Sequence, residues 1–372
     1  MFGNRFEIFR LFGFPIRIDL SWLVILILVT SSLAGGYFPV NHPGMPVTAY
    51  WAMAFVAAIG LFFSILFHET AHALVGRHYR LPIEGITLFI FGGVSEMKEE
   101  AATPKVEFLM SAVGPLASGV LGFVFFYLQH WTEVYEVNRG LQLIFYYLGF
   151  MNLILALFNL VPAFPLDGGR MLRAALWAAK KDYLWATRIA SRLGTGFGWL
   201  MIGYGVWVMA NGGGFSGLWY ILIGFFLKRA SGLSMEVLLL KDKLQQTPLS
   251  VLMRRQFIQF HPQDRLAALG RLLSGRASFS HYPVIDSEHW VGYLDLRQLS
   301  NLSREVWERG SVADVLRKDC ESVSIDVGHN AWEALETMRS GKLYNLFVTQ
   351  EGQLQGVVTA KDLVSFAQEA KS

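Results

Sequence analysis

Apolar stretches alternate with short polar segments through the first 227 residues of the chain. A helix needs about 20 apolar residues to cross the ~30 Å hydrocarbon layer of a bilayer. Six stretches meet or approach this requirement: Leu20–Gly36, Val47–Phe67, Phe108–Gln129, Leu141–Phe158, Leu193–Ala210 and Phe215–Leu227. The last is short, so its helix must continue past Lys228 or be tilted into a thin patch of bilayer. The pattern predicts a multi-pass α-helical membrane protein with six transmembrane helices.

Lysine and arginine residues mark every second connection between these stretches. They precede the first stretch and follow the second, the fourth and the sixth: Arg5, Arg10, Arg17, Arg77, Arg80, Lys98, Lys105, Arg170, Arg173, Lys180, Lys181, Arg188, Arg192, Lys228 and Arg229. The connections in between carry Arg139 alone. Cytoplasmic loops of membrane proteins are enriched in these two residue types. We therefore expect a protein of the cell membrane with both termini in the cytoplasm.

A segment of different character lies between the second and third stretches. Leu81-Pro82 ends the preceding helix, and β-branched and aromatic residues follow from Ile83 to Val94, with two glycines near the end. This composition predicts a short membrane-associated β-strand or hairpin. A strand at that depth must be shielded by protein or face water, because lipid offers no partners for its backbone groups.

Beyond about Lys241, short strands and helices alternate in an order that occurs twice. Pro248–Met253 resembles Gly310–Leu316, and each segment leads into a helix, a strand, a turn and a strand. Two copies of roughly 60 residues make a paired soluble α/β module. We predict a membrane domain over residues 1–240, a first copy over 245–305 and a second over 306–372.

Composition supports this division and excludes several classes of protein. Residues 1–227 contain 26 charged side chains, and the 145 residues that follow contain 35. A wholly soluble enzyme and a disordered chain are therefore excluded. The net charge of +3 argues against a nucleic-acid partner, and Cys320, the single cysteine, allows neither a disulfide within the chain nor a cysteine-based zinc site.

The second apolar stretch ends in His68-Glu69-Thr70-Ala71-His72. Histidines at positions i and i+4 share one face of a helix, so both imidazoles can reach one ion. Glu69 flanks that face, where it can take a proton from a water on the metal. The string is also compatible with a polar helix end whose histidines bond to loop carbonyls. Polar groups at the end of an apolar helix are costly, and this position therefore favours a functional site.

A zinc site that keeps a position open for water needs a third protein ligand. His78 lies off the metal-facing side of a continuing helix, and Glu84 opens the predicted strand. The better candidate is Asp167, because the segment Asn159–Arg170 has two prolines and two glycines that break the helix. The alternative for Asp167 is a cap on a helix that starts near Gly169.

Together, these two motifs resemble the site-2 protease family of intramembrane zinc metalloproteases. The matching residues are His68, Glu69 and His72 on one stretch, and Asn159, Pro162, Leu166, Asp167 and Gly168 after a later one; Gly114–Ser118 and Gly92-Gly93 are also family-like. The resemblance covers about residues 15–230. It implies that His68, His72 and Asp167 bind one Zn²⁺ ion and that Glu69 is the catalytic glutamate. It also implies that Asn159 orients the substrate or stabilises the oxyanion.

The implied substrate is a single-span membrane protein in the lipid bilayer, whose transmembrane helix must unwind before its peptide bond is attacked. We expect the strand segment to clamp the unwound chain by strand addition. The residues expected to form this clamp are Ile86, Phe89, Gly92 and Gly93.

The two C-terminal copies resemble a tandem CBS domain. In the second copy, the stretch from Gly356 to Asp362 matches the family pattern, which implies ATP or another adenine nucleotide, with Thr359 at a phosphate and Asp362 at the ribose hydroxyls. Asp362 is equally compatible with a simple acid at a helix N-terminus. The first copy has Asp295 and Gln298 at the matching positions, which puts its nucleotide binding in doubt. Regulation by nucleotide and a homodimer through the CBS domains are the corresponding expectations.

Two other functions stay open on the sequence. A CBS-regulated ion transporter or channel would use the intramembrane histidines and acids as an ion path. Transport cores often show internal repeats of their spans, and we find none here. The third option is a metal-binding scaffold without activity.

Overall fold

The structure is a computed structural model that describes residues 5–90, 92–97, 100–273, 279–287, 289–299 and 301–369. The chain forms two compact units, Met1–Met235 and Glu236–Ser372. The boundary between them lies inside a long helix, α8 (Phe215–Gln245).

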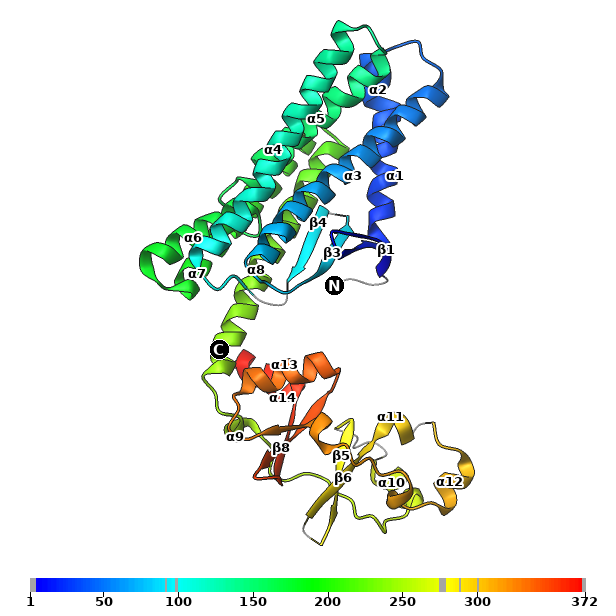
Figure 1. Cartoon of the computed structure of the whole chain (residues 1–372), viewed down its shortest axis with the longest axis vertical. Helices are drawn as coiled ribbons and strands as arrows, with labels where there is room; N and C mark the ends of the chain where they lie inside the picture. The colour runs from blue at the N-terminus through cyan, green and yellow to red at the C-terminus, as the bar shows by residue number, and fades with distance from the viewer. Residues whose placement is uncertain are drawn as a thin grey trace. The chain divides into compact units, whose positions relative to one another are not determined.

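The N-terminal unit is a bundle of long helices with a small sheet at one end (Figure 1). Its helices are α1 (Ser21–Ser32), α2 (Phe38–Asn41), α3 (Val47–His78), α4 (Pro104–Val134), α5 (Arg139–Asn159), α6 (Asp167–Lys180), α7 (Tyr183–Ala210) and the first part of α8. A π-helical segment, Leu33–Tyr37, joins α1 to α2.

Among the described residues, five helical segments are long and apolar enough to cross a membrane. They are Ser21–Asn41, Val47–His78, Pro104–Val134, Arg139–Asn159 and Tyr183–Ala210. The predicted sixth stretch, Phe215–Leu227, begins α8, which runs on past Lys228 to Gln245. The protein is therefore a helical membrane protein with at least the first five of the predicted helices in place.

Capping side chains fix where several of these helices begin. The Thr103 side chain accepts a hydrogen bond from Val106 N at the start of α4. At the start of α5, the Asn138 side chain accepts hydrogen bonds from two backbone N–H groups. Asp182 caps α7 in the same way. Such caps stabilise a helix start by about 1 kcal/mol each. They place the helix ends in the polar connections that the hydropathy pattern indicated.

The sheet of this unit has the strand order β1-β2-β3-β4. Its strands are β1 (Arg5–Leu11), β2 (Phe14–Asp19), β3 (Ile83–Phe89) and β4 (Gly92–Met97). The antiparallel pair β3–β4 is the hairpin expected in this segment, with residue 91 between the strands outside the described part of the chain. Strands β1 and β2 have no counterpart among the predicted elements, and they extend the sheet through a parallel pairing of β2 with β3. Phe14 and Ile16 of β2 pack with Leu66 and Ala73 of α3, so the sheet is attached to the helix that carries both histidines.

The C-terminal unit contains two small sheets, β5–β6 and β7–β8–β9. Its strands are β5 (His281–Asp286), β6 (His289–Asp295), β7 (Ser324–Asp326), β8 (Asn345–Gln350) and β9 (Gln353–Thr359); its helices are α9 (Leu249–Leu252), α10 (Leu266–Leu273), α11 (Leu296–Leu299), α12 (Arg304–Arg309), α13 (Ala331–Gly341) and α14 (Ala360–Glu369). Residues 274–278, 288 and 300, inside the predicted first copy, lie outside the described part.

The two copies in this unit exchange their leading segments. Arg254, before the first copy's strands, forms an antiparallel bridge with Val357 of β9, and Arg317 forms the equivalent bridge with Tyr293 of β6. Accordingly, Leu249 is buried in the core of the second copy, and Val312 in the core of the first. Each core is therefore completed by residues from the other copy's half of the sequence.

Candidate metal centre

Two histidine side chains project from one face of α3. His68 and His72 lie one helical turn apart and are 4% and 7% exposed. Their Nε2 atoms are 3.1 Å from each other. Buried imidazoles with converging ring nitrogens are suited to share one ion.

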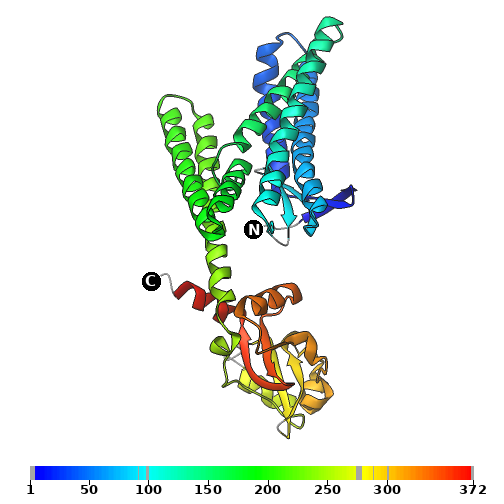
Figure 2. The same cartoon turned by 60° about the vertical axis from the view of Figure 1, so that its left-hand side comes forward.

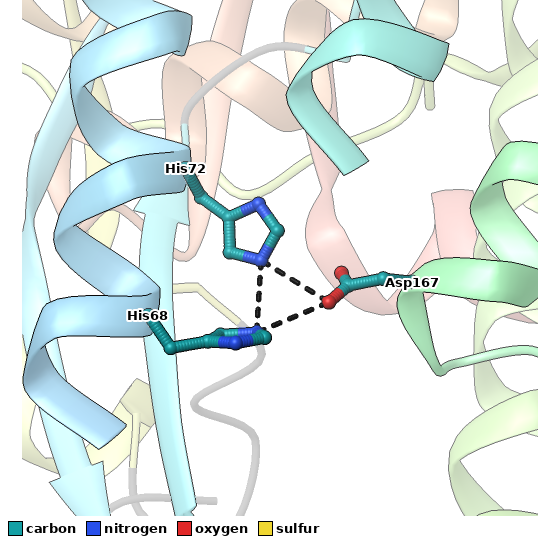
Figure 3. A group of neighbouring side chains, drawn as sticks. All are labelled: His68, His72 and Asp167. Atoms are coloured by element: carbon teal, nitrogen blue, oxygen red, sulfur yellow. Dashed lines mark hydrogen bonds and ion pairs between the residues drawn. The ribbon is translucent and has the colours of Figure 1, made fainter. Parts of the chain in front are cut away.

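Asp167 joins these histidines from a helix far along the chain. One carboxylate oxygen, Asp167 Oδ2, lies 3.1 Å from His68 Nε2 and 3.2 Å from His72 Nε2 (Figure 3). Asp167 is the first residue of α6, directly after the break that the prolines and glycines predicted. The N-cap of α6 is Leu166 and no side chain caps the helix, so Asp167 is not the cap that was its alternative role; its carboxylate belongs to the buried cluster instead.

Close backbone packing holds Asp167 in this place. A Cβ atom on Gly168 would lie 2.2 Å from the carbonyl oxygen of Leu160, and one on Gly169 would lie 2.3 Å from Phe164 N. Only glycine lets the chain fold back so tightly before α6 begins. The two glycines after Asp167 thus allow its carboxylate to reach α3.

The donor set fits a zinc ion. The candidate ligand atoms of His68, His72 and Asp167 all lie within 4.8 Å of one another. Zn–N bonds of about 2.0–2.1 Å in tetrahedral geometry put neighbouring ligand atoms about 3.3 Å apart. The observed separations of 3.1–3.2 Å match that spacing. If these three side chains bind the ion, a fourth position would stay open for water, as in catalytic zinc sites.

Residues of helix α4 contact the Nδ1 atoms of both imidazoles and so orient the two rings. Ser118 Oγ is 2.9 Å from His68 Nδ1, and the backbone carbonyl of Met110 accepts a hydrogen bond from His72 Nδ1. Partners on Nδ1 leave Nε2 free for a metal and fix the ring orientation. Gly114 lies between Met110 and Ser118 on α4, and a Cβ atom at this position would be 2.2 Å from His72 Nε2. The stretch from Gly114 to Ser118 had a family-like sequence, but its contact with the histidines comes from the packing of α3 against α4.

Glu69 lies beside the cluster and contacts the edge strand β4. Ser95 Oγ donates to Glu69 Oε2 at 2.9 Å and approaches Glu69 O at 3.2 Å. A Cβ atom on Gly93 would lie 2.5 Å from Glu69 Cγ. Ser95 belongs to no motif with a characteristic spacing, so the sequence alone does not indicate its contact with Glu69.

Sequence comparison supports the assignment of this site to a known family. A model of peptidase family M50 matches residues 56–137 and 130–201, and a CBS domain model matches residues 312–369. The Rip3 protein of Mycobacterium tuberculosis is 30% identical over 369 residues, covering 95% of this chain and 90% of the relative. Zinc metalloprotease MJ0392 of Methanocaldococcus jannaschii is 26% identical over 359 residues, covering 96% and 94%.

The chain belongs to peptidase family M50, the site-2 proteases. It is a zinc metalloprotease with a C-terminal CBS domain. The solved site-2 protease of M. jannaschii is 28% identical, covers 62% of this chain and 95% of its own, and has a TM-score of 0.46. Family membership supports the enzyme over the ion transporter and over the inactive scaffold.

Among the described residues, neither asparagine of α5 is hydrogen-bonded to the three candidate ligands. Asn159 Nδ2 donates to the carbonyl of Leu155 one turn back (3.0 Å), and no hydrogen bond between described residues links it to the three candidate ligands. Asn152 is fully buried and donates to Ser64 Oγ at 2.9 Å, which ties α5 to α3. His78 is exposed at the end of α3, and its ring contacts Tyr79.

The four clamp residues divide between two strands. Ile86 and Phe89 lie in β3, which pairs with β2 on one side and β4 on the other. Gly92 and Gly93 lie in β4, the outer strand of the sheet as described. An added strand can therefore pair with β4 but not with β3, because both edges of β3 are already used.

The nucleotide candidates of the CBS domain contact each other and an arginine. Thr359 Oγ1 donates to Asp362 Oδ2 at 2.8 Å and accepts from Asp362 N at 3.1 Å, which caps α14. The Arg254 guanidinium donates to both oxygens of Asp362. The Asp362 carboxylate, through this hydrogen-bonded pair, raises the pKa of Arg254 above its usual range. In this structure the carboxylate of Asp362, which is expected to contact the ribose hydroxyls, is already paired with Arg254.

Proposed function

We propose that this M50 protein is an intramembrane protease that hydrolyses peptide bonds within transmembrane segments of other membrane proteins. The observation that carries the proposal is the convergence of three buried side chains, His68 and His72 on the candidate membrane helix α3 and Asp167 at the start of α6. Single-span helices are the natural substrates for a hydrolytic site enclosed in a helical membrane bundle.

The proposed ligands are His68, His72 and Asp167. A bound Zn²⁺ ion supplies a Lewis acid that polarises a peptide carbonyl and lowers the pKa of water. Glu69 accepts a proton from the attacking water and returns it to the amide nitrogen as the C–N bond breaks. Asn159 stabilises the oxyanion, for which its amide must turn away from the carbonyl of Leu155.

The substrate binds as an extended chain along β4. Gly92 and Gly93 belong to that strand, and Gly93 lies against Glu69. A strand paired with β4 would lie roughly 4.8 Å from it, which brings its peptide bonds close to the proposed base. The roles of Ile86 and Phe89 then reduce to supporting β4 from β3.

The proposed topology has six spans with both termini in the cytoplasm. The first part of α8 serves as the sixth span, since α8 is 31 residues long and its segment before Lys228 is uncharged. The arginine and lysine residues of alternate connections support the orientation.

The CBS unit regulates cleavage by binding an adenine nucleotide at Thr359 and Asp362, and it carries the contacts of a homodimer. A ligand that binds one of two conformations more tightly shifts the population toward it. Asp362 is paired with Arg254, so the proposed contact with the ribose requires this pair to open.

The test uses the purified full chain in detergent with a single-span model substrate, and zinc is quantified alongside. We expect Glu69→Gln to keep one zinc per chain and to lose cleavage by about 10²–10⁴-fold. Asp167→Ala should lose both zinc and cleavage. Glu136→Gln, at an exposed turn after α4, is the matched control and should change neither.

A chelator should abolish cleavage, and zinc should restore it. Wild-type cleavage in Glu69→Gln would refute the assigned base. Full activity after removal of all metal would refute the metal-dependent mechanism.

A further inference from the structure

The hairpin of β1 and β2 exposes an unusual amount of apolar surface. Phe6, Ile8 and Phe12 are 56%, 55% and 61% exposed. Figure 2 shows this hairpin, in dark blue, projecting sideways from the end of the helical bundle. Clustered exposed apolar side chains mark a surface that contacts another apolar phase.

The turn of the hairpin holds an aromatic ring at a strained position. Leu11 pairs with Phe14, so Phe12 and Gly13 form a two-residue turn, and both have positive φ angles of 50° and 87°. Such a turn favours asparagine or glycine, and a bulky residue in the left-handed region is strained. Arg77 at the end of α3 donates to the carbonyl of Phe12 at 2.6 Å and holds the turn in place. A strained and exposed phenylalanine stabilises little inside the protein, which points to an external contact.

The position of the hairpin in the chain identifies the phase that it contacts. β2 ends at Asp19, and α1, which opens the first candidate membrane span, begins at Ser21. The hairpin therefore ends two residues before the first candidate membrane span. β1 is an outer strand of the sheet as described, and unpaired backbone groups exclude such an edge from the hydrocarbon core. Water and head groups satisfy those groups in the interface, where aromatic side chains also partition.

Charge on and beside the hairpin fits the head groups of anionic lipids. Arg10 and Arg17 lie on its two strands, and Arg77 lies at its turn, while the strands carry Glu7 and Asp19. Arg10 pairs with Glu7 at 2.9 Å and Arg17 donates to the carbonyl of Glu84, so these arginines reach head groups with their remaining N–H groups. Cations next to exposed apolar side chains are the combination found in interfacial segments.

We propose that the β1–β2 hairpin is an interfacial anchor, seated in the head-group region of the leaflet where α1 begins. Ile8 and Phe12 contact the first methylene groups of the acyl chains, next to the head groups, and the arginines lie among the anionic head groups. This inference needs α1 to cross the bilayer and does not depend on proteolysis. Because β1 to β4 form one sheet, the anchor also sets the depth of β4 beside Glu69.

The single cysteine makes the test direct. In a Cys320→Ser background, an environment-sensitive fluorophore is attached at Ile8→Cys or Phe12→Cys of the full chain, reconstituted in vesicles of phosphatidylcholine and phosphatidylglycerol. Phe123→Cys, 71% exposed on α4, is the reference inside the bilayer, and Glu308→Cys on α12 is the reference in the soluble unit. Nitroxide labels at shallow or deep positions of the lipid act as quenchers.

We expect both hairpin probes to emit at shorter wavelength than the Glu308 probe and to be quenched more by shallow than by deep labels. Emission and quenching equal to those of the Glu308 probe would overturn the proposal. Stronger quenching by deep labels would place the hairpin in the hydrocarbon, and this too would overturn it. A blue shift that disappears on dilution with lipid would assign the surface to a second copy of the chain instead.

A second variant separates lipid contact from folding. Phe12→Asn suits the left-handed turn and should not unfold the hairpin. We expect it to weaken shallow quenching of the Ile8 probe while zinc content and elution volume stay unchanged. Unchanged quenching of the Ile8 probe in this variant would refute the anchoring role of Phe12.

Discussion

The hydroxyl of Ser95 donates a hydrogen bond to the carboxylate of Glu69, with 2.9 Å between Ser95 Oγ and Glu69 Oε2. These residues come from different elements, since Ser95 lies in β4 and Glu69 in α3. The outer strand of the sheet therefore orients the group proposed to transfer the proton. If the substrate also pairs with β4, one strand fixes both partners of the reaction.

Replacement of Ser95 should affect turnover more than substrate binding. A hydrogen bond to a charged group contributes about 1.5–3 kcal/mol, so Ser95→Ala should lower kcat by about tenfold or more with little change in KM. Ser95→Thr keeps the hydroxyl and suits a strand, and it should restore most of the loss. Steady-state kinetics in detergent and zinc quantification check this. A rise in KM alone, or no rescue by threonine, would contradict the positioning role.

A methyl group at Gly114 should prevent metal binding. In Gly114→Ala the new Cβ atom would lie 2.2 Å from His72 Nε2 and 2.7 Å from His68 Nε2, so the imidazoles must move. We expect the purified variant to lose most of its zinc and its cleavage activity together. Gly119→Ala on the same helix is the matched control, because no atom lies within 4 Å of its added Cβ. Full zinc occupancy in Gly114→Ala would show that this packing is not required.

The buried ion pair between Glu107 and Arg173 should stabilise the attachment of α6 to α4. Arg173 donates from Nε to Glu107 Oε1 at 2.7 Å and also from a terminal nitrogen, and the two residues are 5% and 1% exposed. Removing one partner of a buried pair costs about 3–5 kcal/mol, because the other charge stays buried alone. Glu107→Leu and Arg173→Met should each lower the melting temperature strongly.

The double variant distinguishes pairing from mere burial. Replacement of both charges by apolar residues is often neutral, so Glu107→Leu with Arg173→Met should be more stable than either single variant. Strictly additive losses in melting temperature would refute the coupling. Because α6 begins with Asp167, we also expect the single variants to bind zinc more weakly.

Loss of Arg254 should increase the affinity of the CBS unit for adenosine. The guanidinium occupies both oxygens of Asp362, and the proposed ribose contact must displace it. Exposed ion pairs contribute up to about 1 kcal/mol, so Arg254→Ala should tighten adenosine binding by up to about fivefold. Calorimetry on the full chain measures this.

Arg317→Ala is the matched control for that experiment. Arg317 occupies the equivalent bridge position in the other half and pairs with Asp319 instead. Its loss should leave adenosine binding unchanged. Weaker binding in Arg254→Ala would mean that Arg254 belongs to the site rather than competing with the nucleotide.

Local sequence patterns were sufficient to predict most of the fold and part of the candidate site. Hydropathy located the apolar helices, and the spacing of His68 and His72 put both imidazoles on one face, because both properties depend only on helix geometry. The prolines and glycines around Asp167 predicted the break before α6 for the same local reason. Strands β1 and β2 escaped prediction, since a short hairpin rich in arginine and phenylalanine resembles a charged leader before a membrane helix.

Contacts between distant segments were decided only by tertiary packing. Asp167 reaches the histidines because α6 packs on α4, and Ser118 and Gly114 support them because α4 packs on α3. Ser95 meets Glu69 only through the sheet, and the CBS copies exchange segments in a way that their repeat does not encode. Helix periodicity and chain breaks are local properties, so they were sufficient to predict which side chains could do chemistry. Burial and hydrogen bonding between elements depend on the whole unit, so only the folded chain shows which of these side chains meet.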